Sequence, residues 1–410
     1  MKKTSAKTKI KMDRLSGLPD EVVITVLSLL PTLIAARTSV LSRRFRDLWK
    51  ASPSVDLPFI YIPSFKHSTY VAMANSVLLS RRDSLVRLHL KFGHQISGDL
   101  TKSFISSLLL HAHALGLRHL TIHGRAYWDF ESILRSVFSS CTSLQSLSIH
   151  ILPLKPFPFP SAIALTRLKS LSINFISYNS TIIKRLLSEL SSLEHLQLHM
   201  FSGFVCLSSP TIKKLELLLL GESHHLEEPY SLGLFMPSLE FLSLTNYHDS
   251  FHANSNIPLI HGEIPLIRIA VVTLRGLRQK HITAVAQFLN FISYVQRLTL
   301  NLKEHRWEEY PFPLFMEPGK EAPTFPNLKH LDMSLCFHEC NFEAVVTMLH
   351  HSTALESLKL HHKTSDILGD GNGRINAWGL KWPRNGDQSR KRNAWRSKLP
   401  RNRDEQTLNI

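Results

Sequence analysis

Two cysteines and a histidine stand close together in the segment CFHEC, where they could hold a metal ion. The segment contains Cys336, His338 and Cys340, and His350 and His351 follow downstream. Zinc is bound by such thiolates and imidazoles, but structural zinc sites use paired ligand spacings that this segment does not reproduce. We therefore predict no metal site here and no bound cofactor.

Signatures of catalytic sites are missing from the sequence. No GxSxG, HExxH, CxxC or phosphate-binding GKS or GKT motif occurs. The segment GDGNGR from Gly369 lacks the strand, the helix and the distant carboxylate that a nucleotide or calcium site needs. We predict that the chain has no catalytic residues and is not an enzyme.

A repeated pattern organises most of the chain. Aliphatic residues occupy the first, fourth and sixth positions of a hexamer that recurs about every 27 residues, as is typical of leucine-rich repeats. The fourth and sixth residues share one face of a short strand, and only stacked neighbours can bury that face. The hexamers begin at Leu85, Leu117, Leu144, Leu168, Leu193, Ile212, Leu239, Ile264, Val295, Leu328 and Leu355.

These repeats predict an α/β fold, an irregular leucine-rich-repeat solenoid with a parallel sheet on its concave face. Amphipathic segments between hexamers, such as those beginning at Ser180 and Ile282, supply helices for the convex face. Proline-rich connections, such as the one after Ile151, supply irregular loops.

The third and fifth positions of each hexamer, and the residue after the sixth, should point away from the buried face. Histidine recurs there more often than 23 histidines in 410 residues would predict, and the same count places Leu266 and Arg268 on this face. Such donor-rich side chains favour an acidic or phosphorylated segment of a target protein, and titration of histidine would strengthen binding in mild acid. The alternative is that exposed strand positions simply need polar residues. The expected target-binding residues are Arg87, His89, His119, His123, His150, His195, His199, Arg297 and His330.

Charge and hydropathy restrict the classes of partner. Most of the net charge of +16 lies in residues 1–14 and 366–410, so no basic stripe runs through the repeats. Tryptophans interleave with basic residues in the tail, which leaves single-stranded nucleic acid as an alternative but unfavoured partner. No apolar run could span a membrane and no signal peptide is evident, so we expect reduced thiols and an intracellular location, in the nucleus, the cytoplasm or both.

Residues 13–50 do not follow the repeat and form a separate module. An aliphatic segment from Val22 to Leu30 follows Pro19 and two acidic residues, which favours a helix, and two shorter helices should begin near Thr32 and near Ser39 or Ser42. A module this small cannot bury a helix that is apolar on nearly all sides. Either another protein covers the surplus, or the first repeat packs onto this helix.

The module resembles an F-box in its Leu18-Pro19 pair, its acidic pair, its closing Leu29-Leu30-Pro31 and the stretch ARTSVLSRRFRDLW from Ala36. With the repeats, the chain is similar to the plant F-box/leucine-rich-repeat family. The resemblance implies the substrate receptor of a Skp–cullin–F-box ubiquitin ligase, in which the F-box docks on a Skp-type adaptor and the repeats bind the target protein. The adaptor-binding residues that it implies are Leu18, Pro19, Val23, Ile24, Leu27, Leu30, Val40, Leu41 and Trp49.

The chain also departs from the family pattern. Leu33 and Ile34 replace a charged pair, Phe45 stands where tryptophan is common, and the C-terminal domain of many relatives is expected to be absent or truncated after His362. A repeat protein that never joins a ligase is the alternative function. The expected organisation is a basic disordered N-terminus at 1–12, an F-box at 13–52, a linker and cap at 53–84, the solenoid at 85–365 and a basic disordered tail at 366–410.

Overall fold

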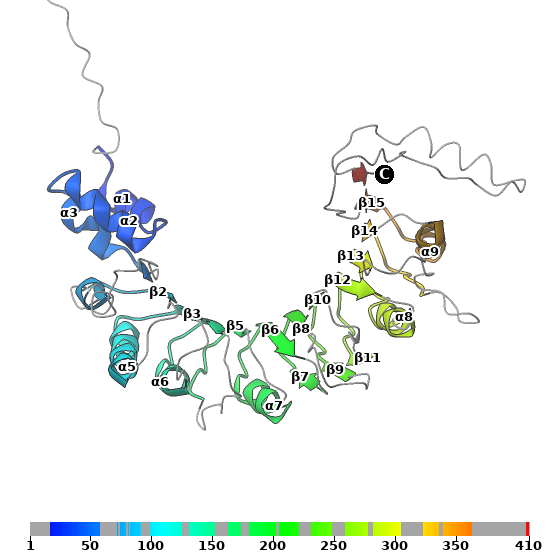
Figure 1. Cartoon of the computed structure of the whole chain (residues 1–410), viewed down its shortest axis with the longest axis horizontal. Coiled ribbons are helices and arrows are strands. Elements are labelled where there is room, and N and C mark those ends of the chain that lie inside the picture. The colour runs from blue at the N-terminus through cyan, green and yellow to red at the C-terminus, as the bar shows by residue number, and fades with distance from the viewer. Residues whose placement is uncertain are drawn as a thin grey trace, which may run out of the picture. The chain divides into compact units, whose positions relative to one another are not determined.

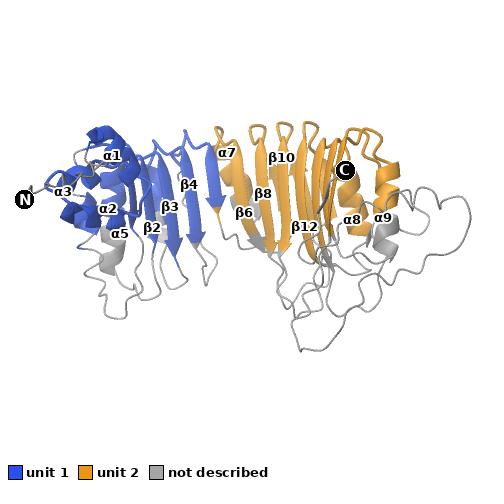
Figure 2. Cartoon of the chain, turned by 90° about the horizontal axis from the view of Figure 1, so that it is seen from above, with its two compact units in different colours: residues 1–172 blue, residues 173–410 orange. Residues whose placement is uncertain are grey.

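The chain divides into two compact units, residues 1–172 and 173–410, which are described separately (Figure 2). The computed structural model describes residues 17–57, 72, 74–78, 81, 83–91, 99–124, 131–151, 163–173, 180–201, 205–220, 231–247, 259–277, 282–304, 323–335, 339–362 and 407–409. None of the helices in these ranges is long and apolar enough to cross a membrane.

Unit 1 begins with a helical module. Pro19 and Pro31 precede the first two helices, where a missing N–H group is tolerated, and Asp20 and Glu21 favour the positive end of the first helix dipole. Ser42 Oγ accepts a hydrogen bond from the Phe45 N–H at 3.3 Å, just as the third α-helix begins. The elements are α1 (Asp20–Leu27), α2 (Thr32–Arg37), the 3-10 helix η1 (Thr38–Val40), α3 (Phe45–Leu48) and the 3-10 helix η2 (Trp49–Ala51).

A parallel sheet follows in unit 1, with helices on one of its sides (Figure 1). Its strands lie in chain order, and β5 ends at the boundary between the units. The strands are β1 (Ser54–Leu57), β2 (Arg87–Lys91), β3 (His119–Gly124), β4 (Ser146–Ile151) and β5 (Ser170–Ile173), and the helices are α5 (Asp99–Ala114) and α6 (Glu131–Ser140).

Unit 2 continues the same construction with parallel strands in the order β6-β8-β10-β12-β13-β14-β15, and β16 pairs antiparallel with β15. The strands are β6 (His195–Phe201), β8 (Lys214–Leu220), β10 (Phe241–Tyr247), β12 (Ile269–Leu277), β13 (Arg297–Glu304), β14 (His330–Leu335), β15 (Ser357–His362) and β16 (Thr407–Asn409). The helices are α7 (Ser180–Glu189), α8 (Ile282–Phe291) and α9 (Glu339–His350).

Unit 2 also contains a second sheet that the repeat pattern did not predict. It consists of the parallel strands β7 (Val205–Ser208), β9 (Ser231–Phe235) and β11 (Leu259–Glu263), in the order β11-β9-β7. Figure 1 shows these strands on the side of the main sheet where other repeats carry helices. Each strand is followed by a proline, Pro210, Pro237 or Pro265, that stands two residues before the next buried aliphatic residue.

The hexamer pattern marks the core. The first, fourth and sixth residues are buried in almost every repeat, as Leu117, Leu120 and Ile122 illustrate. Backbone hydrogen bonds keep the repeats in register, because the N–H groups of Gln145 and Ser146 both donate to the carbonyl of Arg118, at 2.8 and 3.0 Å. The same pairing recurs from repeat to repeat, so each new strand satisfies the backbone of the one before it. The predicted fold class, a short helical module followed by the parallel-strand sheet of a leucine-rich-repeat solenoid, is confirmed.

One hexamer was placed wrongly. Register pairs Leu242 with Ala270 and Leu244 with Val272, so the repeat begins at Ile267 rather than at Ile264. The small side chain of Ala270 hides the fourth position in the sequence, while Ile264, Ile267 and Ile269 imitate the pattern. Ile269 consequently lies on the outward side of β12 next to Phe241. Leu266 and Arg268 lie in the turn before that strand instead of on the sheet.

Candidate functional site

The helical module has a small core of its own. Val23, Leu27, Ala35 and Phe45 are buried against one another, and Leu18, Leu48 and Trp49 pack partly against them. Phe45 is therefore a core residue of the module. Val23 and Leu27 were expected to face the adaptor, but they are 1% and 3% exposed and support the surface from inside.

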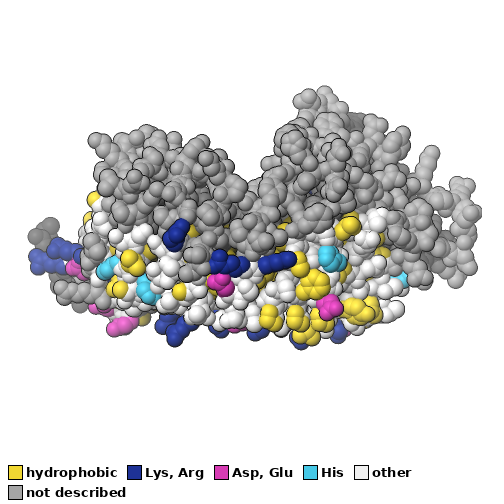
Figure 3. All heavy atoms as spheres, turned by 90° about the horizontal axis from the view of Figure 1, so that it is seen from below, with side chains coloured by type: hydrophobic (Ala, Val, Ile, Leu, Met, Phe, Trp, Pro, Cys, Tyr) yellow, Lys and Arg dark blue, Asp and Glu magenta, His cyan; other side chains and the backbone are white. Residues whose placement is uncertain are grey.

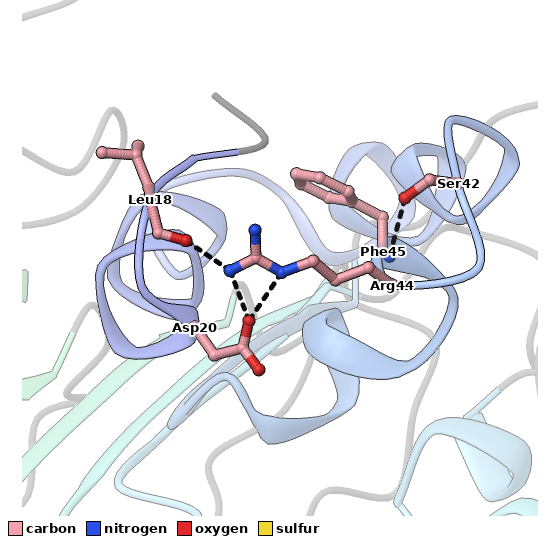
Figure 4. Close-up of polar contacts among 5 residues, drawn as sticks. All are labelled: Leu18, Asp20, Ser42, Arg44 and Phe45. Carbon is pink, nitrogen blue, oxygen red and sulfur yellow. Dashed lines mark hydrogen bonds and ion pairs between the residues drawn. The ribbon is translucent and has the colours of Figure 1, made fainter. Parts of the chain in front are cut away.

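An ion pair and a backbone hydrogen bond, both made by Arg44, join two segments of this module. Arg44 Nε and Nη2 donate to Asp20 Oδ1 at 2.7 and 2.5 Å, and Nη2 also donates to the carbonyl oxygen of Leu18 (Figure 4). The guanidinium thus joins the segment before α3 to the start of α1. Because the group is partly exposed, the contribution of the ion pair itself is modest, and the hydrogen bond to the backbone adds positional specificity.

Outside this core the module leaves a set of large apolar side chains exposed. Leu29 is 76%, Val40 86% and Leu41 64% exposed. We call the whole set the apolar surface of the module: Val22, Val26, Leu29, Leu30, Ile34, Val40 and Leu41.

Only part of the predicted adaptor-binding set coincides with this surface. Leu30, Val40 and Leu41 belong to it, and Pro19 is exposed at the start of α1. The other predicted residues are half-buried: Leu18, Ile24 and Trp49. The prediction missed Val22, Val26, Leu29 and Ile34, although the four-residue spacing of Val22 and Val26 beside that of Val23 and Leu27 indicates two neighbouring stripes on one helix.

The module is joined to the first strand of the sheet without losing this surface. α2 packs against β1, and the backbone N–H of Asp56 donates to Thr32 Oγ1 at 2.8 Å. The buried Arg81 reaches the end of the module, since its Nη2 donates to the carbonyl oxygens of Lys50, at 2.7 Å, and Ser52. Burial lowers the pKa of Arg81 to about 10, opposed by the charge of Asp83. The sheet therefore meets the module through β1 and α2.

The second candidate surface is the open face of the unit 1 sheet, the face opposite to its helices. Arg87, His89, His119, His123 and His150 are all at outward positions, as predicted from the hexamers. The ring centroids of His123 and His150 are 4.4 Å apart with the rings stacked, and those of His89 and His123 are 5.1 Å apart. We call His89, His123 and His150 the histidine cluster.

Polar groups at the edge of the cluster orient two of its rings. His89 Nδ1 lies 3.3 Å from Asp56 Oδ1, and His150 Nε2 lies 2.6 Å from Ser148 Oγ. His89 Nε2 is buried and makes no hydrogen bond within the described part of the chain. Asp56 was not predicted, because the sequence offered no repeat hexamer at β1.

Three histidines of the open face, His89, His119 and His123, have lowered pKa values. Burial, with the neighbouring His150, His89 and Lys91, lowers the pKa of His123 to about 4. Burial also lowers the pKa of His89 against the opposing effect of Asp56, and burial together with Arg87 and Arg118 lowers the pKa of His119. The imidazole of His123 is therefore neutral at pH 7 in the free protein, and the open face is less positive than its histidine content suggests.

The predicted target-binding residues of unit 2 are more dispersed. One lateral row across the strands contains His195, Lys214, Phe241, Ile269, Arg297 and His330 in this order. Arg297 and His330 are therefore neighbours, while an apolar pair separates them from Lys214 and His195. His199 lies further along β6, opposite Leu218.

The remaining predictions concern possible metal, nucleotide and nucleic-acid sites, most of whose residues the structure does not describe. Cys336, His338, Gly369 and the tryptophans of the tail lie outside the described residues, and the structure describes only the backbone at Cys340. Within the described ranges, no group of three histidine, cysteine, aspartate or glutamate side chains could hold a metal ion. Figure 3 shows cationic, acidic and apolar side chains mixed on the helix-bearing side, without a continuous basic stripe among the coloured residues.

Comparisons with known proteins match the two parts of the chain separately. Residues 15–56 match the F-box domain, and residues 105–262 match the leucine-rich repeats of FBD-associated F-box protein At5g56370. The F-box match contains the whole apolar surface, and the repeat match contains β3 and β4 with His119, His123 and His150.

Similar proteins come from Arabidopsis thaliana. F-box/FBD/LRR-repeat protein At1g80470 is 26% identical over 359 residues, covering 85% of this chain and 73% of the relative. FBD-associated F-box protein At5g56370 is 29% identical over 358 residues, covering 85% and 75%. F-box/FBD/LRR-repeat protein At5g22700 is 34% identical over a shorter stretch of 151 residues, covering 36% and 33%. The chain therefore carries an F-box match followed by a leucine-rich-repeat match, and it is similar over most of its length to plant F-box/leucine-rich-repeat proteins.

Proposed function

We propose that the protein is the substrate-recognition subunit of a Skp–cullin–F-box ubiquitin ligase, in which the F-box binds a Skp-type adaptor and the repeats bind the target protein. The observation that carries this proposal is the apolar surface of the module. Seven large apolar side chains stay exposed although the module has a closed core and is joined to the sheet.

A surface of this composition is unusual on a protein that works alone, and contiguous exposed apolar groups mark sites of association. Burying one such side chain contributes about 1.5 to 3 kcal/mol, so a few of them can supply a large part of a specific affinity. The occupant that the F-box match supports is a Skp-type adaptor. The adaptor in turn would carry the cullin scaffold.

In this proposal the protein contributes position rather than bond chemistry. A target held on the repeats is brought near a conjugating enzyme that the partner subunits carry, which raises the effective concentration of its lysines. The open face of the sheet is the surface proposed for the target, because it presents side chains that packing does not need.

Binding of the full chain to a purified Skp-type adaptor tests the proposal. We expect Val26→Asp and Leu29→Asp each to weaken adaptor binding by about tenfold or more, since each places a charge in an interface that must lose water. Leu110→Asp is the matched control, because Leu110 is another exposed leucine of unit 1 but lies on α5, outside the module.

A different outcome would favour the alternative, a repeat protein outside any ligase. If the wild-type chain binds no Skp-type adaptor, or if Leu29→Asp and Leu110→Asp bind it equally well, the proposed docking surface is wrong.

A further inference from the structure

The histidine cluster concentrates titratable groups on three neighbouring strands of unit 1. His89, His123 and His150 come from β2, β3 and β4, and the ring of His123 lies within contact distance of the other two. Outward positions of a sheet do not require such groups, because Ser146, Ser148 and Ser170 occupy equivalent positions on β4 and β5. The cluster is therefore unlike the polar surface that packing alone would select.

Charged neighbours approach the cluster from each strand packed against it. β1 contributes the carboxylate of Asp56, β2 contributes Arg87 and Lys91, and β3 contributes His119. On β4 the neighbours described are the serine hydroxyls and His150 itself. Apart from Asp56, the titratable groups described around the cluster are cations or potential cations.

This composition disfavours protonation of the free cluster and favours an anion. Burial depresses the pKa of His123 most, and repulsion from the neighbouring imidazoles and from Lys91 adds to this effect, so each added proton is disfavoured. A carboxylate or phosphate oxygen placed at the edges of the rings, where their N–H groups point, would offset that repulsion and accept hydrogen bonds from the protonated rings. Anion binding and proton binding must then strengthen each other by the same factor.

We infer that the histidine cluster binds an anionic segment of the target protein, one that carries carboxylate or phosphate groups, and that the cluster takes up protons when this segment binds. The inference rests on the proposed role of the repeats in target binding. According to this inference, the anionic segment of the target protein binds to unit 1, and it binds more strongly in mildly acidic solution.

A metal ion is the competing occupant for clustered imidazoles. Ligating nitrogens must converge on one point, whereas the rings of His123 and His150 are stacked with only 21° between their planes. The described residues also provide no group of three donors suited to a metal. The stacked geometry therefore disfavours a metal ion as the occupant of the cluster.

Nuclear magnetic resonance titration of the histidine rings in the full chain tests the inference. The probes are a hexaglutamate peptide, a peptide of the same length with phosphoserines, a glutamine peptide and inorganic phosphate. We expect either anionic peptide to raise the pKa of His123 by at least two units, and its affinity to rise about twofold or more from pH 7.5 to pH 6.0. The glutamine peptide should do neither.

Matched variants separate the cluster from the rest of the open face. His123→Gln and His150→Gln should abolish the pH dependence of binding, while His195→Gln, on the unit 2 sheet, should preserve it. An unchanged pKa of His123 with both anionic peptides would overturn the inference, and so would an effect of inorganic phosphate alone, which would indicate a free-anion site. Perturbation by zinc but by no peptide would assign the cluster to a metal instead.

The outcome is independent of adaptor docking. His123→Gln leaves the apolar surface of the module intact, so its adaptor binding should equal that of the wild type. A chain that binds the peptides but no adaptor would retain this inference and lose the ligase role.

Discussion

Thr32 Oγ1 accepts a hydrogen bond from the backbone N–H of Asp56 at 2.8 Å, and this bond joins the F-box to the first strand of the sheet. Thr32 is buried at the start of α2, so the side of the module that meets the sheet is defined by α2. Val22 and Val26 of α1 and Val40 of η1 thereby stay exposed.

Replacement of Thr32 by valine should destabilise the junction. The substitution keeps the side-chain shape but leaves the Asp56 N–H without its acceptor, which costs about 1 to 3 kcal/mol when such a group is buried. Urea denaturation of the full chain measures the loss. Thr25→Val is the control, because Thr25 is exposed on α1 and bonds only within its own helix, and it should change stability by a smaller amount.

Arg44→Ala should loosen the F-box without affecting the repeats. The substitution removes the bonds to Asp20 and to the Leu18 carbonyl, and we expect a loss of about 1 to 2 kcal/mol from an exposed ion pair and one backbone hydrogen bond. Hydrogen exchange should become faster in α1 and α3 while β3 and β4 keep their protection. Arg43→Ala, one residue earlier and exposed, should leave exchange unchanged.

The free protein should lose stability as the pH falls from about 6.5 toward 4. His123 has a folded-state pKa of about 4, below its ordinary value, so the unfolded chain binds more protons in this range and unfolding is favoured. The lowered pKa values of His89 and His119 act in the same direction.

Melting temperatures across this pH range measure the effect. His123→Gln should flatten the dependence, whereas His195→Gln should not. A wild-type melting temperature that is constant between pH 6.5 and 4.5 would contradict the depressed pKa values.

Gly262→Ala should disrupt the second sheet. Gly262 has φ of +131°, and a Cβ atom there would lie 2.0 Å from the carbonyl oxygen of Leu234 on the neighbouring strand. We expect a loss of about 3 kcal/mol or more from the strained conformation and the backbone clash. Gly116→Ala is the control: Gly116 also has positive φ, but its Cβ would meet nothing within 4 Å, so a loss of about 1 kcal/mol is expected in thermal denaturation.

The repeats could be predicted because their signal is periodic and strong. Leucine and isoleucine at the first, fourth and sixth positions predicted the strands, and these in turn predicted which histidines face outward. The prediction failed where a small residue interrupted the period, since Ala270 concealed the true register and moved Ile269 onto the outward side. In this region a proline stands two residues before the first buried aliphatic residue of each repeat. This spacing, applied to Pro265, would have indicated Ile267 as the start of the repeat.

The F-box was harder to resolve in detail. Its sequence predicted three helices and an apolar surplus, but a helix that is apolar on most sides does not reveal which stripe its own core takes. Val23 and Leu27 face Phe45, and only the folded arrangement leaves Val22 and Val26 exposed. Asp56 and Arg81 could not be assigned, because their partners lie across the junction rather than in a local motif.

Hydrogen exchange of the full chain with and without a Skp-type adaptor tests the central claim most directly. We predict that the adaptor slows exchange in residues 20–41, which carry the apolar surface, while the strands β2 to β4 exchange as in the free chain. Protection confined to the repeats, or unchanged exchange at saturating adaptor, would contradict the account.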